Sequence, residues 1–293
     1  MRVCAIDVGT NTVMSVVADV DGDRLHVLAD EERFARLGEG VDASGRLSEA
    51  AMGRVLDRLA GAVGTAETLG AERVVIGATS ASRDAANVGD LQERVRQSLG
   101  LEYRVISGAE EAEASFRGAL AMLPDLNDAL VVDIGGGSTE VARGTRAAGV
   151  TDRQSVDVGS VRLTERHFSE RPPSAEAVAA ALADAEAIYS GVAVERGEAP
   201  LVATGSVGLL MARLVEADDR VPAEAVRPWR DRLLALAPEE ALAVAPDVLA
   251  GREDVAAAAL LLLHAVLVRF GADAYVPTAG GLRHGLALAE GAR

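Results

Sequence analysis

The stretch that most constrains this chain is residues 131–141, which reads V-V-D-I-G-G-G-S-T-E-V. An apolar run typical of a strand carries Asp133, three glycines and a serine follow, and a second extended run begins at Thr139 with Glu140 beside it. Consecutive glycines let the backbone turn tightly and bring several N–H groups against one anion. The two carboxylates suit Mg²⁺, which also accepts phosphate oxygens and water. The stretch predicts a strand-turn-strand phosphate loop, distinct from a P-loop because no Gly-Lys-Ser/Thr follows it.

A shorter copy of this pattern, D-V-G-T-N-T, occupies residues 7–12. Its aspartate, first glycine and last hydroxyl match the central stretch at one constant offset of 126 residues: Asp7 with Asp133, Gly9 with Gly135, and Thr12 with Ser138. Apolar, β-rich runs flank both copies, as expected for a duplicated strand-turn-strand. The repeat predicts an anion-binding turn in each half of the chain. Two ordinary β-hairpins with glycine turns are the alternative interpretation.

Strands followed by helices occur twice along the 293 residues, which predicts two α/β domains around a shared cleft. We place the boundary at Pro124-Asp125, giving domains 1–124 and 125–293. The longest apolar stretch, residues 255–268, is too short to span a bilayer and predicts a buried helix. Ser48 is expected to cap a helix, and Asn87 with Asp90 fits a capping box.

The charge of the chain limits its partners. The net charge is −16, and all 29 cationic residues are arginines. Such a surface repels nucleic acid and anionic membranes, so we expect neither as a partner. Cys4 is the single cysteine and falls in the first apolar run, which excludes a disulfide within the chain and indicates a reducing, cytoplasmic location.

A candidate proton acceptor lies in I-S-G-A-E-E-A-E, residues 106–113. Ser107 and Glu110 fit a capping box at a helix start. Glu111 points about 100° away around the helix and is not needed for the cap. A carboxylate on a first helical turn stays ionised and can accept a proton from water. The alternative is that Glu111 is one more solvated helix charge.

Three other stretches carry weaker signals. Arg83 follows a strand within T-S-A-S-R-D-A-A-N, where its planar fork of donors suits a phosphate. The glycine-rich stretches T-G-S-V-G (204–208) and G-G-L-R-H-G (280–285) lie between strands and helices. Each can bind an anion at a helix N-terminus or turn a corner, and a corner is the simpler interpretation.

Taken in order, D-V-G-T-N-T, T-S-A-S-R-D-A-A-N, I-S-G-A-E-E-A, D-I-G-G-G-S-T-E and G-G-L-R-H-G resemble the exopolyphosphatase/guanosine pentaphosphate phosphohydrolase (Ppx/GppA) family over nearly the whole chain. The resemblance implies two actin-like domains of the ASKHA, ribonuclease H-like type, with the active site in the interdomain cleft. It also implies release of terminal orthophosphate from inorganic polyphosphate, dependent on Mg²⁺ or another divalent cation.

The resemblance also assigns roles to residues. Glu111 matches the family's catalytic glutamate, which would act as general base for an attacking water. Asp133 and Glu140 match the acidic residues tied to the metal, and Asp7 is a further candidate ligand. The matched phosphate contacts are Asn11, Thr12, Arg83, Gly135, Gly136, Gly137 and Ser138.

Two departures from the family pattern stand out. The chain stops soon after G-G-L-R-H-G and looks like the short, two-domain form, and His284 differs from the residues frequent at its position. With a net charge of −16 and no lysine, we expect a preference for short polyphosphate chains.

Three alternatives stay open from the sequence. The first is 5′-phosphohydrolysis of pppGpp, for which the same catalytic set serves. The second is a non-hydrolytic, actin-like nucleotide-binding protein, and the third an ATP-dependent kinase of the same fold. A homodimer is a common outcome for such folds.

Overall fold

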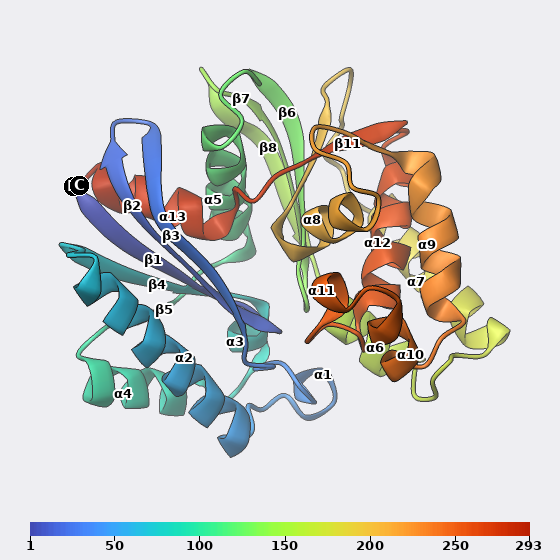
Figure 1. Cartoon of the computed structure of the whole chain (residues 1–293), viewed down its shortest axis with the longest axis horizontal. Coiled ribbons are helices and arrows are strands. Elements are labelled where there is room, and N and C mark those ends of the chain that lie inside the picture. Colours follow the sequence, from blue (N-terminus) through green and yellow to red (C-terminus); the bar gives the residue numbers. More distant parts are fainter. The chain divides into compact units, whose positions relative to one another are not determined.

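The computed structural model describes all 293 residues and divides into two compact units (Figure 1). The first unit comprises Met1–Leu126 together with Gly280–Arg293, and the second comprises Asn127–Ala279. The predicted break after residue 124 lies close to the observed one. The predicted domain 125–293 differs from the structure at its end, because the last helix packs into the first unit.

The first unit is built on a mixed sheet with the strand order β3-β2-β1-β4-β5. The first three strands pair antiparallel, whereas β4 pairs parallel to β1 and β5 parallel to β4. The strands are β1 (Arg2–Val8), β2 (Thr12–Asp21), β3 (Arg24–Phe34), β4 (Arg73–Ala78) and β5 (Tyr103–Val105).

Helices cover both faces of this sheet, as Figure 1 shows. They are α1 (Val41–Ser44), α2 (Glu49–Thr68), α3 (Ser80–Asp84), α4 (Val88–Leu99), α5 (Gly108–Ala121) and α13 (Leu282–Gly291). Side chains of β1 alternate between the faces, as the pleat requires. Cys4, Ile6 and Val8 join the core under α2 and α4, whereas Val3 and Ala5 pack with α13. The buried Cys4 agrees with its predicted strand position.

The packing of α13 explains why the C-terminal segment belongs to the first unit. A Cβ built on Gly118 of α5 would lie 2.0 Å from the carbonyl oxygen of Gly281. One built on Gly285 would lie 2.0 Å from the carbonyl oxygen of Ala114. Only glycine allows the backbones to approach this closely. The glycines at both ends of G-G-L-R-H-G therefore serve close helix packing, in line with the simpler of its two interpretations.

An ion pair between buried Arg283 and Asp30 also ties α13 to the sheet. Arg283, which is 4% exposed, donates to both carboxylate oxygens of Asp30 on β3, at 2.7 and 2.8 Å. The neighbouring His284 is fully buried, its Nε2 lies 3.5 Å from Oδ2 of Asp30, and neither ring nitrogen makes a hydrogen bond. Burial, and secondarily the positive charge of Arg283, lower the pKa of His284 to about 4. The imidazole is therefore neutral in the folded protein at neutral pH.

We expect His284 to make the fold acid-sensitive. An unfolded histidine titrates near pH 6.5, so between about pH 6.5 and 4 the unfolded chain binds a proton that the folded chain does not. Stability therefore falls as the pH drops through this window, by roughly 3 kcal/mol at about 1.4 kcal/mol per pH unit. Urea unfolding of the wild type and His284→Gln across pH 4–7 measures it, and the variant should show a shallower slope.

The exposed His26 on β3 gives the matched control, since His26→Gln should keep the wild-type slope. Equal slopes for the wild type and His284→Gln would show that His284 is not the acid-sensitive group.

The second unit repeats the arrangement of the first. Its sheet has the order β10-β11-β9-β6-β7-β8, with antiparallel β6, β7 and β8 and with β9 and β11 added in parallel. Asp133 pairs with Glu140 across β6 and β7, and Asp7 pairs with Met14 at the same offset across β1 and β2. The predicted duplication of a strand-turn-strand is therefore confirmed. The strands are β6 (Asp128–Ile134), β7 (Thr139–Thr145), β8 (Gly149–Val156), β9 (Leu201–Thr204), β10 (Val221–Pro222) and β11 (Ala274–Pro277).

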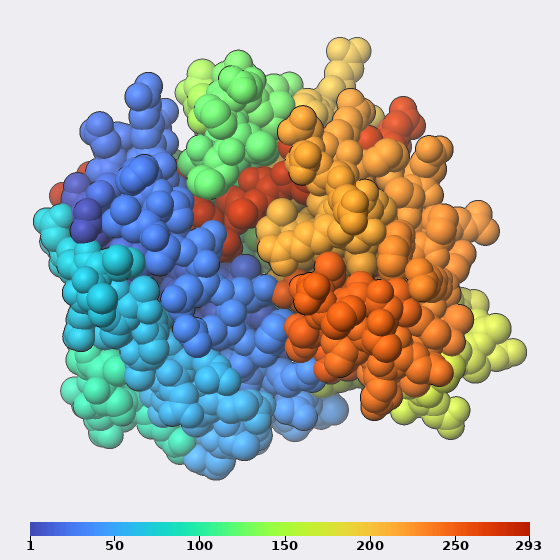
Figure 2. Space-filling view, viewed as in Figure 1, coloured from blue at the N-terminus to red at the C-terminus, as the bar shows by residue number.

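More helix surrounds this second sheet. The helices are α6 (Ser160–His167), α7 (Ala175–Ser190), α8 (Gly205–Leu214), the 3₁₀ turn η1 (Ala223–Ala225), α9 (Val226–Leu234), α10 (Pro238–Val244), α11 (Pro246–Leu249) and α12 (Ala256–Arg269). The segment from α8 to α11, amber to orange in Figure 2, makes up most of the visible surface of this unit. α12 is buried along most of its length, as predicted for residues 255–268. None of the helices combines the length and apolarity needed to cross a membrane.

Of the two predicted helix caps at Ser48 and Asn87, the structure confirms the first and contradicts the second. Ser48 caps α2 by accepting from the amide of Ala51, as predicted. Asn87 precedes α4 but makes no side-chain cap, so the predicted capping box there is wrong. Its side-chain amide instead accepts from the amide of Leu47 and donates to the carbonyl of Leu47. The hydrogen-bonding groups of Asn87 are therefore used by a distant loop and not by the end of α4.

Candidate active site

In both units, the turn between the first two strands closes in the same way. The amide of Gly9 donates to the carbonyl of Thr12 at 2.9 Å, and that of Gly135 donates to the carbonyl of Ser138 at 2.9 Å. In the first unit the segment after β3 supports this turn, because Gly38 donates to the carbonyl of Thr10 at 2.8 Å. Asn11 lies at the tip of this turn, where it is half-buried, and Thr12 begins β2. The structure thus places two of the three predicted phosphate contacts of this unit, Asn11 and Thr12, on one tight turn.

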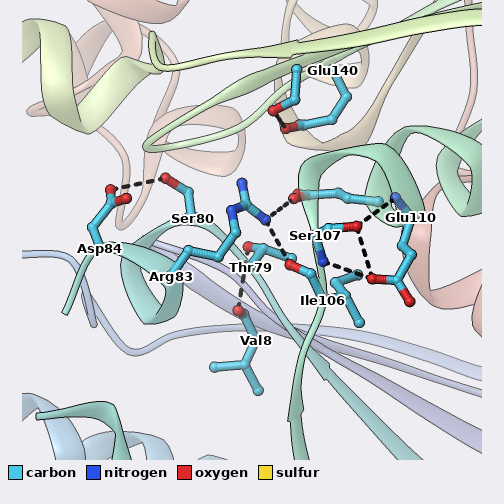
Figure 3. A network of polar contacts seen from close by, with 11 residues as sticks. Val8, Thr79, Ser80, Arg83, Asp84, Ile106, Ser107, Glu110 and Glu140 are labelled. Carbon is cyan, nitrogen blue, oxygen red and sulfur yellow. Dashed lines mark hydrogen bonds and ion pairs between the residues drawn. The ribbon is translucent and has the colours of Figure 1, made fainter. Parts of the chain in front are cut away.

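Arg83 and Glu111 form an ion pair within the first unit. Nη1 of Arg83, at the end of α3, donates to Oε2 of Glu111 at 2.6 Å and to the carbonyl of Ile106 at 3.2 Å, the second contact being visible in Figure 3. Glu111 stands on the first turn of α5 and is 7% exposed. The structure therefore brings together the predicted base and a predicted phosphate ligand. The ion pair holds the carboxylate in one orientation.

The neighbouring Glu110 has a separate, structural role. Its Oε2 accepts from the amide and the hydroxyl of Ser107, at 2.9 and 2.8 Å, while Ser107 Oγ accepts from the Glu110 amide (Figure 3). These contacts with Ser107, followed by the guanidinium of Arg104, lower the pKa of Glu110 below its usual value. The predicted capping box is confirmed. Glu110 is committed to the helix start, and Glu111 is not needed for the cap.

In the second unit, Asp133 and Glu140 face each other across β6 and β7. Directly opposite residues of an antiparallel pair share one face, with Cβ atoms about 4.5–5.5 Å apart. Glu140 is 2% exposed and accepts from Ser155 Oγ, on β8, at 2.7 Å. Burial, aided by the negative charge of Glu140, raises the pKa of the nearby Tyr189. Two neighbouring carboxylates repel each other unless a cation lies between them.

The start of α8 lies against Asp133. A Cβ built on Gly205 would lie 2.8 Å from Oδ1 of Asp133, and Gly205 has φ +70°, which favours glycine. The positive end of the helix dipole therefore stabilises this carboxylate. The glycine of T-G-S-V-G thus allows Asp133 to approach the helix end.

The donor set fits a hard cation. Asp133 and Glu140 offer carboxylate oxygens on one sheet face, and Mg²⁺ typically uses one or two carboxylates together with water and substrate phosphates. The structure gathers no group of three or more His, Cys, Asp or Glu side chains that could hold a metal by itself. Asp7 lies at the end of β1 in the first unit, where Met14 stands opposite it in place of a second carboxylate. The second unit therefore carries the better cation pair.

A comparison with known families decides the identity of the chain. The model of the Ppx/GppA phosphatase family matches residues 15–291. The chain belongs to this family. The matched range includes Arg83, Glu111, Asp133 and Glu140, the residues to which the family resemblance assigned catalytic, metal or phosphate roles.

Individual relatives agree with the family. Exopolyphosphatase 2 of Mycobacterium tuberculosis is 41% identical over 190 residues, covering 61% of this chain and 59% of the relative. A guanosine-5′-triphosphate,3′-diphosphate pyrophosphatase of Vibrio cholerae is 38% identical over 170 residues, covering 57% of this chain and 33% of the relative. The matched part thus spans less than two thirds of either relative. The crystal structure of an exopolyphosphatase from Cytophaga hutchinsonii aligns with a TM-score of 0.85, 26% identity and coverage of 100% and 98%.

Within this Ppx/GppA chain, sequence reasoning missed the supporting roles of several residues. Ser155 donates a hydrogen bond to Glu140, and the absence of a side chain on Gly205 leaves room for the carboxylate of Asp133. Gly159 and Arg162 contact the central glycine turn. A signal for the last two was present in D-V-G-S-V-R, residues 157–162, which follows the third strand of the second repeat. In the first repeat Gly38, which follows the third strand, is also packed against its turn, where a Cβ would lie 2.2 Å from the Thr10 side chain.

Proposed function

We propose that this chain is an exopolyphosphatase that releases terminal orthophosphate from inorganic polyphosphate. One observation carries the proposal beyond membership of the family. Glu111 is held by Arg83 at 2.6 Å on the first turn of α5, next to but separate from the capping glutamate. A buried, oriented carboxylate is what a general base requires. A nucleotide-binding protein without hydrolysis has no use for it.

The proposed reaction is in-line hydrolysis. Glu111 accepts a proton from water as the water oxygen attacks the terminal phosphorus. The bond from that phosphorus to the bridging oxygen breaks, its electron pair stays on the shortened chain, and orthophosphate leaves. Asn11, Thr12 and Arg83 are the proposed phosphate contacts of the first unit. In the second unit, backbone amides of the glycine turn would donate hydrogen bonds to non-bridging phosphate oxygens, where charge is concentrated. The turn residues of the second unit in this role are Gly135, Gly136, Gly137 and Ser138.

A divalent cation completes the proposal. Asp133 and Glu140 would hold Mg²⁺, and Asp7 is a further candidate ligand. When bound, the ion would supply positive charge to the phosphate oxygens. The single buried Cys4 supports a reducing, cytoplasmic location.

Chain length is the finer part of the proposal. With a net charge of −16 and no lysine, the surface offers little to hold an extended polyanion. We therefore propose a preference for short polyphosphate and low processivity. Equally fast, processive digestion of long polyphosphate would contradict this preference.

A second candidate function is removal of the 5′ γ-phosphate of pppGpp. The similarity to the Vibrio cholerae pyrophosphatase favours it, and the same catalytic residues would serve. A non-hydrolytic, actin-like role would instead require ATP binding without phosphate release.

The deciding experiment measures orthophosphate release with Mg²⁺ from short polyphosphate, long polyphosphate, pppGpp and ATP side by side. Faster release from polyphosphate than from pppGpp is the expected result. Release from pppGpp alone would support the sister activity. No release from any substrate, with ATP bound tightly, would overturn the hydrolase proposal.

A further inference from the structure

The central glycine turn rests on the start of α6 through every one of its first three carbonyl groups. Gly135 O accepts from the amide of Ser160 at 3.0 Å, and Gly136 O accepts from the amides of Val161 and Arg162 at 2.8 and 3.1 Å. The third carbonyl, of Gly137, accepts from Nε of Arg162 at 2.7 Å. Two carbonyls are thus held by backbone and the third by a side chain.

These contacts orient the amides of the turn. In a planar trans peptide, a carbonyl and the following N–H point in opposite directions. The carbonyls of Gly135, Gly136 and Gly137 point toward α6, so the amides of Gly136, Gly137 and Ser138 point away from it. Three successive N–H groups on one side make an anion-binding concavity.

Gly159 shows independently how closely α6 approaches this turn. A Cβ built on Gly159 would lie 2.4 Å from the carbonyl carbon of Gly136 and 2.5 Å from the amide nitrogen of Gly137. Its φ is −153°, an extended conformation that any residue adopts, so the close approach alone requires glycine. The backbone at the start of α6 therefore contacts the turn directly, in addition to the contact made by the Arg162 side chain.

We propose that Arg162 is a positioning residue that orients the Gly137–Ser138 peptide so that the Ser138 amide faces the terminal phosphate. This inference rests on the proposed phosphate-releasing function. Arg162 acts through the turn and not through the substrate. The contact with the turn is made by the N–H at its Nε, and the proposal assigns the effect to this donor rather than to the positive charge.

Two substitutions separate the donor from the charge. Nε2 of glutamine is the same number of bonds from Cα as Nε of arginine, so Arg162→Gln keeps an N–H at that place without the charge. Arg162→Met has similar length and no donor. We expect Arg162→Met to lower kcat/KM for phosphate release about 10- to 100-fold, less than the loss of a whole oxyanion donor. Arg162→Gln should stay within about threefold of the wild type.

A binding measurement keeps this test independent of turnover. Calorimetric affinity for inorganic phosphate should weaken in Arg162→Met and be recovered in Arg162→Gln, which a merely structural role would not produce. If the wild type hydrolyses none of the substrates, the proposed function fails while the phosphate affinities still test Arg162. Equal losses in the Gln and Met variants, or wild-type values in both, would overturn the inference.

Two controls complete the design. Arg227 lies on α9 of the same unit in an exposed pair with Asp231 at 3.6 Å, and Arg227→Ala should leave both readouts unchanged. Thermal melts establish that each variant is folded. Arg162→Leu is a second donor-free variant and replaces Arg162→Met if that protein does not fold.

Discussion

Glu111→Gln is expected to lower kcat for orthophosphate release by about 100- to 10,000-fold, the range that a positioned general base supplies. The amide keeps the shape of the side chain and an oxygen that can still accept from Arg83. Substrate binding and folding should therefore change little, and the loss should appear in kcat rather than in KM. Steady-state phosphate release and a thermal melt measure both.

The control for this prediction stands on the same helix. Glu113 is half-buried and pairs with Arg117 at 3.2 Å without being placed in the site, so Glu113→Gln should retain nearly full activity. A Glu111→Gln variant with more than about a tenth of the wild-type kcat would show that another group accepts the proton.

Glu140→Gln is expected to weaken Mg²⁺ binding, so that Mg²⁺ no longer supports activity or raises the melting temperature. Neutralising one of two facing carboxylates removes a cation ligand and also removes their repulsion. Activity should fall by at least about 100-fold at ordinary Mg²⁺ concentrations. The melting temperature of the variant without metal should stay at or above that of the wild type. Mg²⁺ should raise the melting temperature of the wild type, because a ligand that binds only the folded state stabilises it, and should not raise that of the variant.

Removal of the metal by a chelator tests the same Mg²⁺ requirement in the unmutated protein. Treatment with EDTA should abolish phosphate release, and added Mg²⁺ should restore it. Glu176, exposed at the start of α7, supplies the control Glu176→Gln, which should respond to Mg²⁺ as the wild type does. An identical Mg²⁺ response in Glu140→Gln and the wild type would mean that Glu140 is not a metal ligand.

Local patterns predicted the repeated turns and the start of α5 well. The turn formed by the glycines after Asp133 and the capping box of Ser107 and Glu110 depend on contacts between residues a few positions apart. Such contacts can be predicted from the sequence alone. Asn87 shows the limit of such patterns. Its spacing to Asp90 fits a cap, yet its side chain bonds Leu47, 40 residues earlier, because tertiary contacts outweigh a local cap.

The support of the site could not be predicted in this way. Arg162 reaches Gly137 from 25 residues away, across the whole of β7 and β8, and the contact depends on the register of those strands. The pairing of Arg83 with Glu111 likewise depends on two helices that follow adjacent parallel strands. Sequence indicated both residues of this pair, and only the fold shows that they touch.

The return of α13 to the first unit affects how the protein is made. Val3 and Ala5 of β1 share a buried cluster with Leu282 and Leu286, so one face of the first sheet lacks much of its apolar cover until α13 has been synthesised. A ribosome that has delivered the first 126 residues has exposed an incomplete core. The second unit, continuous from Asn127 to Ala279, has all of its residues available earlier. The first unit can therefore complete its core only after α13 has been synthesised, although most of its residues leave the ribosome before the second unit.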